Sequence, residues 1–274
     1  MSSVLRPGFD AVVRSPLLGV QFRDAVDGRV VADGLRVEIE DLWQPGRKRA
    51  LEANRSGVFA LHEFAGMRGF EGDIVDSPPA PGRFRVTAVD PLGRYVATAF
   101  SPPLPCPGLY APASAGSPSA APTHVPLYSA ATRPLPVAMA SLRTELRRAF
   151  DDDLPVPWAR LVLRAGTQQL AEGLSDAAGR VLLVFPMPRP PQPALRASPG
   201  MPGTRFEWTV TLHAYGSAER SADEIPDLDD VLAQPEVTLL QGASPPVPLA
   251  PLTLTGGETL VVPGPSSPFL YVAE

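Results

Sequence analysis

The chain has 274 residues, a net charge of -5 and a hydrophobic content of 44%. This length is long for one β-sandwich and sufficient for two. The charges are spread out, and no run of basic residues could follow a phosphate backbone, so a nucleic acid partner is not expected. The 35 prolines disfavour long helices, because proline lacks the N–H that a helix interior requires. The single cysteine, Cys106, excludes an internal disulfide and a site built from several cysteines.

The first 15 residues form the expected N-terminal arm. Arg6, Asp10 and Arg14 interrupt its apolar residues, so the sequence shows no secretory signal. No stretch approaches the roughly 18 apolar residues that a membrane-spanning helix needs. We therefore expect a cytoplasmic protein, either free or as part of an assembled or released particle, with no membrane partner.

Residues 16–103 carry the pattern of a first β-sandwich. Leu35, Val37 and Ile39 alternate with charged residues, which is typical of a strand with one buried face. The turn Asp90-Pro91-Leu92-Gly93 separates two further runs and predicts a hairpin between them. The expected strands are 17–23, 34–40, 58–61, 83–89 and 94–100.

Residues 104–136 are rich in proline, alanine and serine. Their central part, 111–122, contains no large apolar residue and cannot bury enough surface to order itself. We interpret 104–136 as a linker that neighbouring segments can clamp.

Residues 137–234 repeat the order of the first half and predict a second sandwich. The runs 158–164, 181–185 and 205–214 correspond to 35–40, 58–61 and 83–89.

Two segments of this second half are ambiguous. Val137 to Phe150 fits a helix or a strand, and the repeat favours the strand because a second sandwich needs an opening strand. Ile225 to Leu232 reads as irregular chain with one helical turn at 227–232. Residues 235–274 supply closing strands or an arm that pairs with a neighbour.

The sequence contains no recognisable catalytic motif. His62-Glu63 lacks the second histidine of a zinc protease, and His124 and His213 would have to come from the linker and the second sandwich to complete a metal site. No Gly-x-Ser-x-Gly pentapeptide is present, and Gly256-Gly257 lacks the lysine of a phosphate-binding loop. We assign no catalytic, cofactor-binding or metal-binding residue, and we expect a protein that is not an enzyme and needs no cofactor.

The remaining charged and aromatic groups favour ordinary structural roles. Trp43, Trp158 and Trp208 could be ligand platforms, but Trp158 and Trp208 fall in expected strands and are interpreted as core packing. The tripeptide Arg47-Lys48-Arg49 is interpreted as a solvated loop. The acidic clusters are also interpreted as solvated loops, although such loops could bind calcium; they comprise Asp151, Asp152 and Asp153, and Asp223, Glu224, Asp227, Asp229 and Asp230.

One family resemblance rests on the second half. The runs 157–163 and 174–183, the second of which contains the turn Asp176-Ala177-Ala178-Gly179, resemble the carboxypeptidase regulatory-like, or transthyretin-like, domain. The first half departs from the family by having Asn54-Arg55-Ser56-Gly57 in place of the aspartate turn. The resemblance implies an Ig-like or transthyretin-like sandwich and transfers no catalytic residue.

The whole chain, including 125–128 and 133–136, also resembles accessory components of phage-tail-like contractile injection systems. This resemblance implies a bacterial structural or adaptor protein at the baseplate or cap region. Its partners would be other protein subunits, and no small-molecule substrate is expected. Two alternatives stay open: a carbohydrate- or calcium-binding sandwich, and a hydrolase whose carboxylates, set roughly 5 to 10 Å apart, follow no sequence motif.

Overall fold

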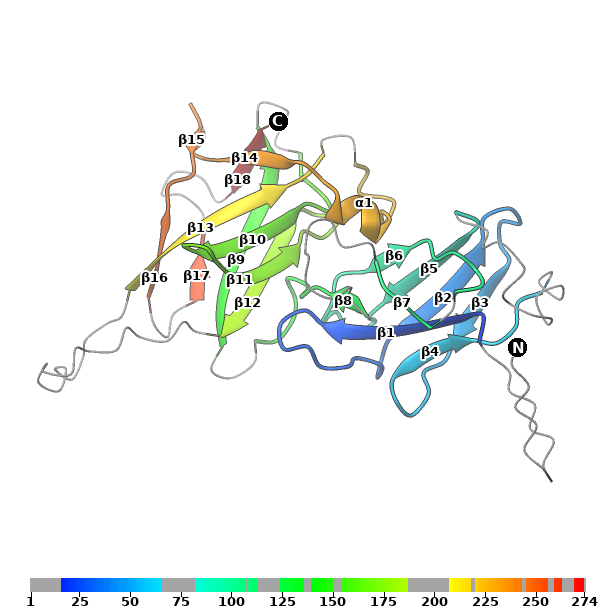
Figure 1. The fold of residues 1–274 in the computed structure, drawn as a ribbon. Coiled ribbons are helices and arrows are strands. Elements are labelled where there is room, and N and C mark those ends of the chain that lie inside the picture. The colour runs from blue at the N-terminus through cyan, green and yellow to red at the C-terminus, as the bar shows by residue number, and fades with distance from the viewer. Residues whose placement is uncertain are drawn as a thin grey trace, which may run out of the picture.

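The structure is a computed structural model. It describes residues 16–65, 82–106, 108–112, 124–135, 139–149, 154–186, 207–217, 220–242, 245–255, 259–262 and 269–273. The described chain is almost entirely β, as the sequence predicts, and forms two sandwiches that lie next to each other (Figure 1).

The first sandwich consists of two sheets. One has the order β4-β1-β7, with β8 also paired to β1, and the other has the order β3-β2-β5-β6. The bounds are β1 Leu18–Asp24, β2 Arg36–Asp41, β3 Lys48–Leu51, β4 Val58–Leu61, β5 Phe84–Val89, β6 Thr98–Phe100, β7 Leu109–Tyr110 and β8 Val125–Leu127.

The second sandwich is built on a longer path of strands, β11-β10-β13-β14-β18-β9-β12. Three short strands flank this path, because β15 pairs with β14, β16 with β13, and β17 with β9. The bounds are β9 Met139–Arg148, β10 Arg160–Ala165, β11 Gln168–Leu174, β12 Arg180–Pro186, β13 Glu207–Tyr215, β14 Glu236–Gln241, β15 Val247–Pro248, β16 Leu252–Thr255, β17 Thr259–Val261 and β18 Leu270–Ala273.

The two sandwiches share one pairing plan, which confirms the internal repeat. In the first, β1 pairs antiparallel with β4 and parallel with β7 and β8. In the second, β9 pairs antiparallel with β12 and parallel with β17 and β18. The other sheet of each sandwich matches as well. In the first sandwich β2 lies between β3 and β5, and in the second β10 lies between β11 and β13; all four pairings are antiparallel. The segment 137–150 is therefore a strand over the described residues, as the repeat predicts.

The turn before β4 also matches the turn before β12. The Asp176 side chain accepts hydrogen bonds from the amides of Ala178 and Arg180, at 2.9 and 3.0 Å. The Asn54 side chain accepts equivalent bonds from Ser56 and Val58, at 2.9 and 3.1 Å. An asparagine oxygen replaces a carboxylate oxygen here without changing the turn, so the departure seen in the sequence leaves the local geometry intact.

Two parts of the first half differ from the sequence expectation. The range 104–136, interpreted as a linker, contributes β7 and β8, which lie along β1. The predicted 83–89 and 94–100 pair is antiparallel as expected, but only Thr98–Phe100 pairs with β5. The reason is that 94–96 pairs with 128–130 instead, through a bridge between Tyr95 and Ser129.

The expected helical turn is present as α1, Leu228–Leu232, with Asp227 as its N-cap. Five residues make less than two turns, and no helix among the described residues is long and apolar enough to cross a membrane.

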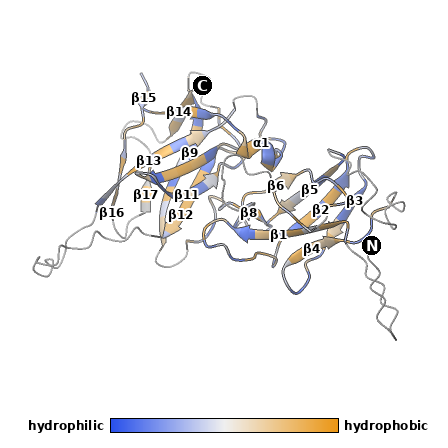
Figure 2. Ribbon diagram, in the orientation of Figure 1, coloured by the Kyte–Doolittle hydropathy of each residue, from blue (hydrophilic) through white to orange (hydrophobic). Residues whose placement is uncertain are grey.

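Each sandwich has a core of buried hydrophobic residues, and Figure 2 shows hydrophobic residues along the strands of both. β12 is buried on both faces along Val181 to Phe185, whereas β2 alternates buried and partly exposed residues. The core of the first sandwich also contains residues from the second half of the chain, namely Trp158, Leu174, Leu228 and Val231. The two sandwiches thus share buried apolar contacts.

Candidate functional site

The most elaborate polar arrangement of the described residues lies where the chain leaves the first sandwich. β8 runs parallel to β1, with Leu127 opposite Asp24, so the next segment passes over the end of β1. We call this segment, Tyr128 to Leu135, the connector. Its amides and carbonyls pair with 94–96, since Val96 N–H donates to the Tyr128 carbonyl and Ala130 N–H to the Arg94 carbonyl, both at 2.9 Å.

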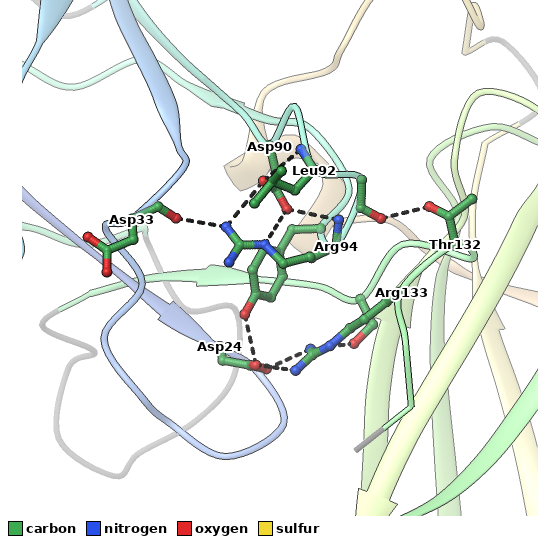
Figure 3. Close-up of polar contacts among 10 residues, drawn as sticks. Asp24, Asp33, Asp90, Leu92, Arg94, Thr132 and Arg133 are labelled. Carbon is green, nitrogen blue, oxygen red and sulfur yellow. Dashed lines mark hydrogen bonds and ion pairs between the residues drawn. The ribbon is translucent and has the colours of Figure 1, made fainter. Parts of the chain in front are cut away.

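Asp24 and Arg133 form a buried ion pair that holds the connector against β1 (Figure 3). The guanidinium donates to both carboxylate oxygens, at 3.1 and 2.5 Å, and the side chains are only 11% and 4% exposed for Arg133 and Asp24. Tyr95 donates a further hydrogen bond to Asp24 at 3.0 Å, and Val26 N–H another at 2.9 Å. Asp24 is therefore well supplied with donors.

The pKa of Asp24 reflects two opposing effects. Burial alone would raise it, but the hydrogen bonds and the positive charge of Arg133 outweigh burial and hold the pKa below its ordinary value. Burial, together with the charge of this carboxylate, raises the pKa of the Tyr95 hydroxyl to about 12. The cluster thus keeps a charged carboxylate beside a neutral phenol at neutral pH.

A second ion pair stabilises the turn beneath the connector. Asp90 accepts from the backbone N–H and Nε of Arg94, at 2.8 and 2.9 Å, and Arg94 Nη2 donates to the Asp33 carbonyl at 2.8 Å. Thr132 on the connector donates to the Gly93 carbonyl of this turn at 2.7 Å. Figure 3 shows the two pairs near each other. The guanidinium groups of Arg94 and Arg133 lie 5.4 and 5.0 Å from the centre of the Tyr95 ring.

The connector also contacts the second sandwich. Tyr128 donates to Glu172 on β11 at 3.1 Å, and Arg143 on β9 donates to the Ala131 carbonyl at 2.8 Å. Glu172 accepts a further bond from Gln169 at 3.0 Å and pairs with Arg160 at 3.4 Å. This arrangement can hold two sandwiches in a fixed orientation, and its groups are committed to one another.

The three histidines are not brought together. His62 is exposed after β4, His124 precedes β8, and His213 lies on β13, where its Nδ1 contacts Glu236 at 2.8 Å. Burial, followed by the charge of Arg23, lowers the pKa of His124. Within the described ranges, no group of three or more His, Cys, Asp or Glu side chains could hold a metal ion.

The acidic cluster around α1 is largely committed to structural contacts. Asp227 caps the helix by accepting from Asp229 N–H at 3.0 Å, and Asp229 accepts from Tyr110 at 3.4 Å. Glu224 pairs with Arg85 at 2.9 Å, while Asp223 and Asp230 are exposed. The other cluster, Asp151 to Asp153, lies outside the described residues.

Two interpretations of individual residues were wrong. Trp158 is not in a strand: it sits in the turn before β10 with a φ of 58°, and it packs into the core of the first sandwich. Its indole N–H donates to the Ser221 carbonyl at 3.0 Å, which explains its position at the junction. Lys48 and Arg49 are exposed as expected, but they begin β3 rather than lying in a loop, because they pair with β2.

The other two tryptophans and the cysteine have simpler surroundings. Trp208 is partly buried against the second core, in agreement with a packing role. Trp43 is 70% exposed, with the Arg83 guanidinium 4.9 Å from the centre of its ring. Cys106 is partly buried, and burial raises the pKa of its thiol.

Sequence reasoning missed the connector cluster because its members are far apart in the chain. Asp24 and Arg133 are separated by 109 positions, and no local pattern links them. The turn around Asp90 was recognisable from Asp-Pro-Leu-Gly, but its ion pair with Arg94 was not.

No protein-family model and no curated protein sequence matches the chain. Among solved structures, the chain is similar to the Bacillus anthracis TIE protein, at 11% identity and a TM-score of 0.22, over 91% of this chain and 34% of that chain. The chain thus spans about a third of the length of the solved chain that it matches. A TM-score this low carries no argument about function.

Proposed function

We propose that this protein is a non-catalytic structural adaptor, built from two transthyretin-like sandwiches, that docks onto other protein subunits of a large assembly. The assembly we infer is a phage-tail-like contractile injection system particle, with the adaptor in its baseplate or cap region. The protein would be made in the cytoplasm and leave it only with the particle.

The observation that carries the proposal is an uncharged sheet edge on the second sandwich. β16 pairs on one side with β13, and no other strand of the described chain pairs with it. Residues 237–257, which include β15 and β16, contain no charged side chain. Soluble proteins usually blunt such edges with charges, because an exposed edge offers unpaired backbone groups to another strand.

The edge at β3 of the first sandwich provides the contrast. Lys48 and Arg49 lie on it and are exposed, which is the ordinary protection against edge-to-edge pairing. The region of β15 and β16 carries no charged side chain, although Pro248 lies on β15, and Val247 beside it is 49% exposed. An extended strand of a partner subunit could add to β16 through backbone hydrogen bonds.

Two features of the connector support an adaptor rather than an enzyme. Its titratable groups are paired with one another, and its hydrogen bonds to both sandwiches suit a part that holds them in a fixed orientation. The carbohydrate-binding, calcium-binding and hydrolase alternatives gain no comparable support from the described residues.

The proposal is tested with a tagged copy of the full chain in its native host. Particles are separated by density-gradient sedimentation, and the tagged chain is located by mass spectrometry with cross-linking. We expect the wild-type chain to sediment with a sheathed particle and to cross-link to its subunits through 245–255.

A matched pair of variants makes the test specific. Thr253 is exposed on β16, so Thr253→Lys adds a charge to the edge while Thr253→Ser keeps it uncharged. The lysine variant should fold normally and lose particle association, and the serine variant should retain it. Recovery of wild-type chain only as a free protein would refute the adaptor role, and equal association of both variants would exclude the β16 edge.

A further inference from the structure

The edge of β6 is covered by a segment of the second half of the chain. We call this segment, Glu224 to Leu232, the clasp; it connects β13 to β14 and contains α1. Asp227 forms a parallel β-bridge with Ala99 on β6. The clasp therefore lies along an edge of the first sandwich, although it belongs to the second (Figure 1).

Apolar side chains anchor the clasp. Leu228 and Val231 are each 2% exposed, and both belong to the core of the first sandwich. Beside them, the ring of Tyr110 stacks on that of Phe100, with centroids 4.6 Å apart. Leu228 and Val231 line a small hollow together with Ala97 to Ala99 and Trp158, so the clasp and β6 face each other across it.

Polar contacts with the first sandwich fix the direction in which the clasp runs. Arg85 on β5 pairs with Glu224 at 2.9 Å and also donates to the Ile225 carbonyl. Tyr110 donates to Asp229 at the far end, at 3.4 Å. Donors from the first sandwich thus meet acceptors at both ends of the clasp.

Comparison of the two sandwiches shows what the clasp replaces. In the second, β14 pairs on one side with β13 and on the other with β18. In the first, the equivalent strand β6 pairs with β5 and, on its other side, bridges to the clasp. The second sandwich closes with its own strand, and the first closes with a segment from its neighbour.

We propose that the β6 edge and the apolar surface beside it form a segment-accepting site, and that the clasp is its occupant, completing the first sandwich in cis. The chemistry that the site recognises is an acidic segment with an aspartate-capped turn and two aliphatic residues three positions apart. Donation of a segment to an open sheet edge is a general mode of recognition.

A peptide of residues 222–234, labelled at its N-terminus, tests the site in the full-length protein. In the wild type the tethered clasp acts at an effective concentration of about millimolar, so micromolar peptide should not displace it. Leu228→Asp should release the clasp and let the peptide bind about tenfold more tightly or better, measured by fluorescence anisotropy. A peptide with aspartate at both aliphatic positions is the control and should bind neither protein.

Equal binding of the peptide to wild type and to Leu228→Asp would overturn the proposal. Should Leu228→Asp fail to fold, hydrogen exchange of the milder Val231→Ala decides the question. Exchange at 98–100 should then accelerate about tenfold together with exchange at 225–232, while β10 is unaffected. Acceleration confined to 225–232 would show that the clasp does not complete the sandwich. The exposed neighbour Asp230→Asn serves as a matched control and should change neither region.

Discussion

Asp24 is a buried carboxylate whose charge is compensated almost entirely by one residue of the connector. Removing one partner of such a pair leaves the other buried without compensation, which typically costs about 3–5 kcal/mol. We expect Asp24→Asn to lower the free energy of unfolding by about this amount, measured by urea denaturation.

Asp27→Asn is the matched control for this substitution. Asp27 pairs with Arg29 at 3.2 Å, but the Arg29 side chain is 84% exposed. Exposed pairs contribute about 1 kcal/mol or less. Similar losses for the two variants would contradict a special role for the buried pair.

Three aspartates give the stability a predictable acid dependence. Asp24, Asp41 and Asp90 all have a pKa held below the ordinary value of 3.8, Asp41 chiefly by hydrogen bonds from Arg83. A carboxyl group with a lower pKa in the folded state stabilises the fold above its unfolded pKa and loses that contribution as the pH falls.

We therefore expect the urea midpoint to be steady near neutral pH and to fall as the pH drops below about 4. Asp24→Asn should show a smaller fall over the same range, because one of the titrating groups is gone. A fall of the same size in both proteins would argue that other carboxyl groups dominate the acid response.

At the scale of elements, the Asp176 turn places a glycine where no other residue fits. Gly179 has a φ of 76°, and a Cβ there would collide with the Leu146 carbonyl on β9. Gly166, between β10 and β11, also has a positive φ of 57°, but a Cβ there would meet nothing within 4 Å.

Substituting alanine at Gly166 and Gly179 distinguishes the cost of a strained backbone conformation from the cost of a steric clash. Gly166→Ala should cost about 1 kcal/mol, the usual penalty for a positive φ. Gly179→Ala should cost clearly more, because a backbone carbonyl must also shift. Thermal unfolding of the two variants in parallel provides the measurement, and equal costs would show that β9 yields to the added methyl group.

The sequence was most informative about individual strands and turns. Alternation and turn chemistry identify β2, β5, β10 and β12, since these signals are local. The short strands β7 and β8 were assigned to a linker, because two or three residues among prolines carry no periodicity and are ordered only by pairing with β1. The connector cluster was hidden because Arg133 and Asp24 are 109 positions apart and only the fold brings them together.

For the whole molecule, shared buried residues predict cooperative unfolding. Trp158, Leu174, Leu228 and Val231 belong to the second half of the chain but pack in the core of the first sandwich. Separation of the sandwiches would expose this apolar surface to water, at about 25 cal/mol for each Å².

We expect one unfolding transition for both sandwiches. Hydrogen exchange by mass spectrometry under increasing denaturant should release the amides of β2 and β10 at the same midpoint, because neither core survives loss of the other. Two separate midpoints would mean that the shared contacts are too weak to couple the sandwiches.

The position of the clasp in the chain has a consequence for synthesis. A ribosome delivers the first sandwich early, yet Leu228 and Val231, which belong to its core, emerge only after most of the second sandwich has been made. More than 120 further residues after Thr98–Phe100 must therefore be synthesised before the clasp can cover the edge of β6. During that interval the edge of β6 is open to a chaperone, or to a strand from another molecule.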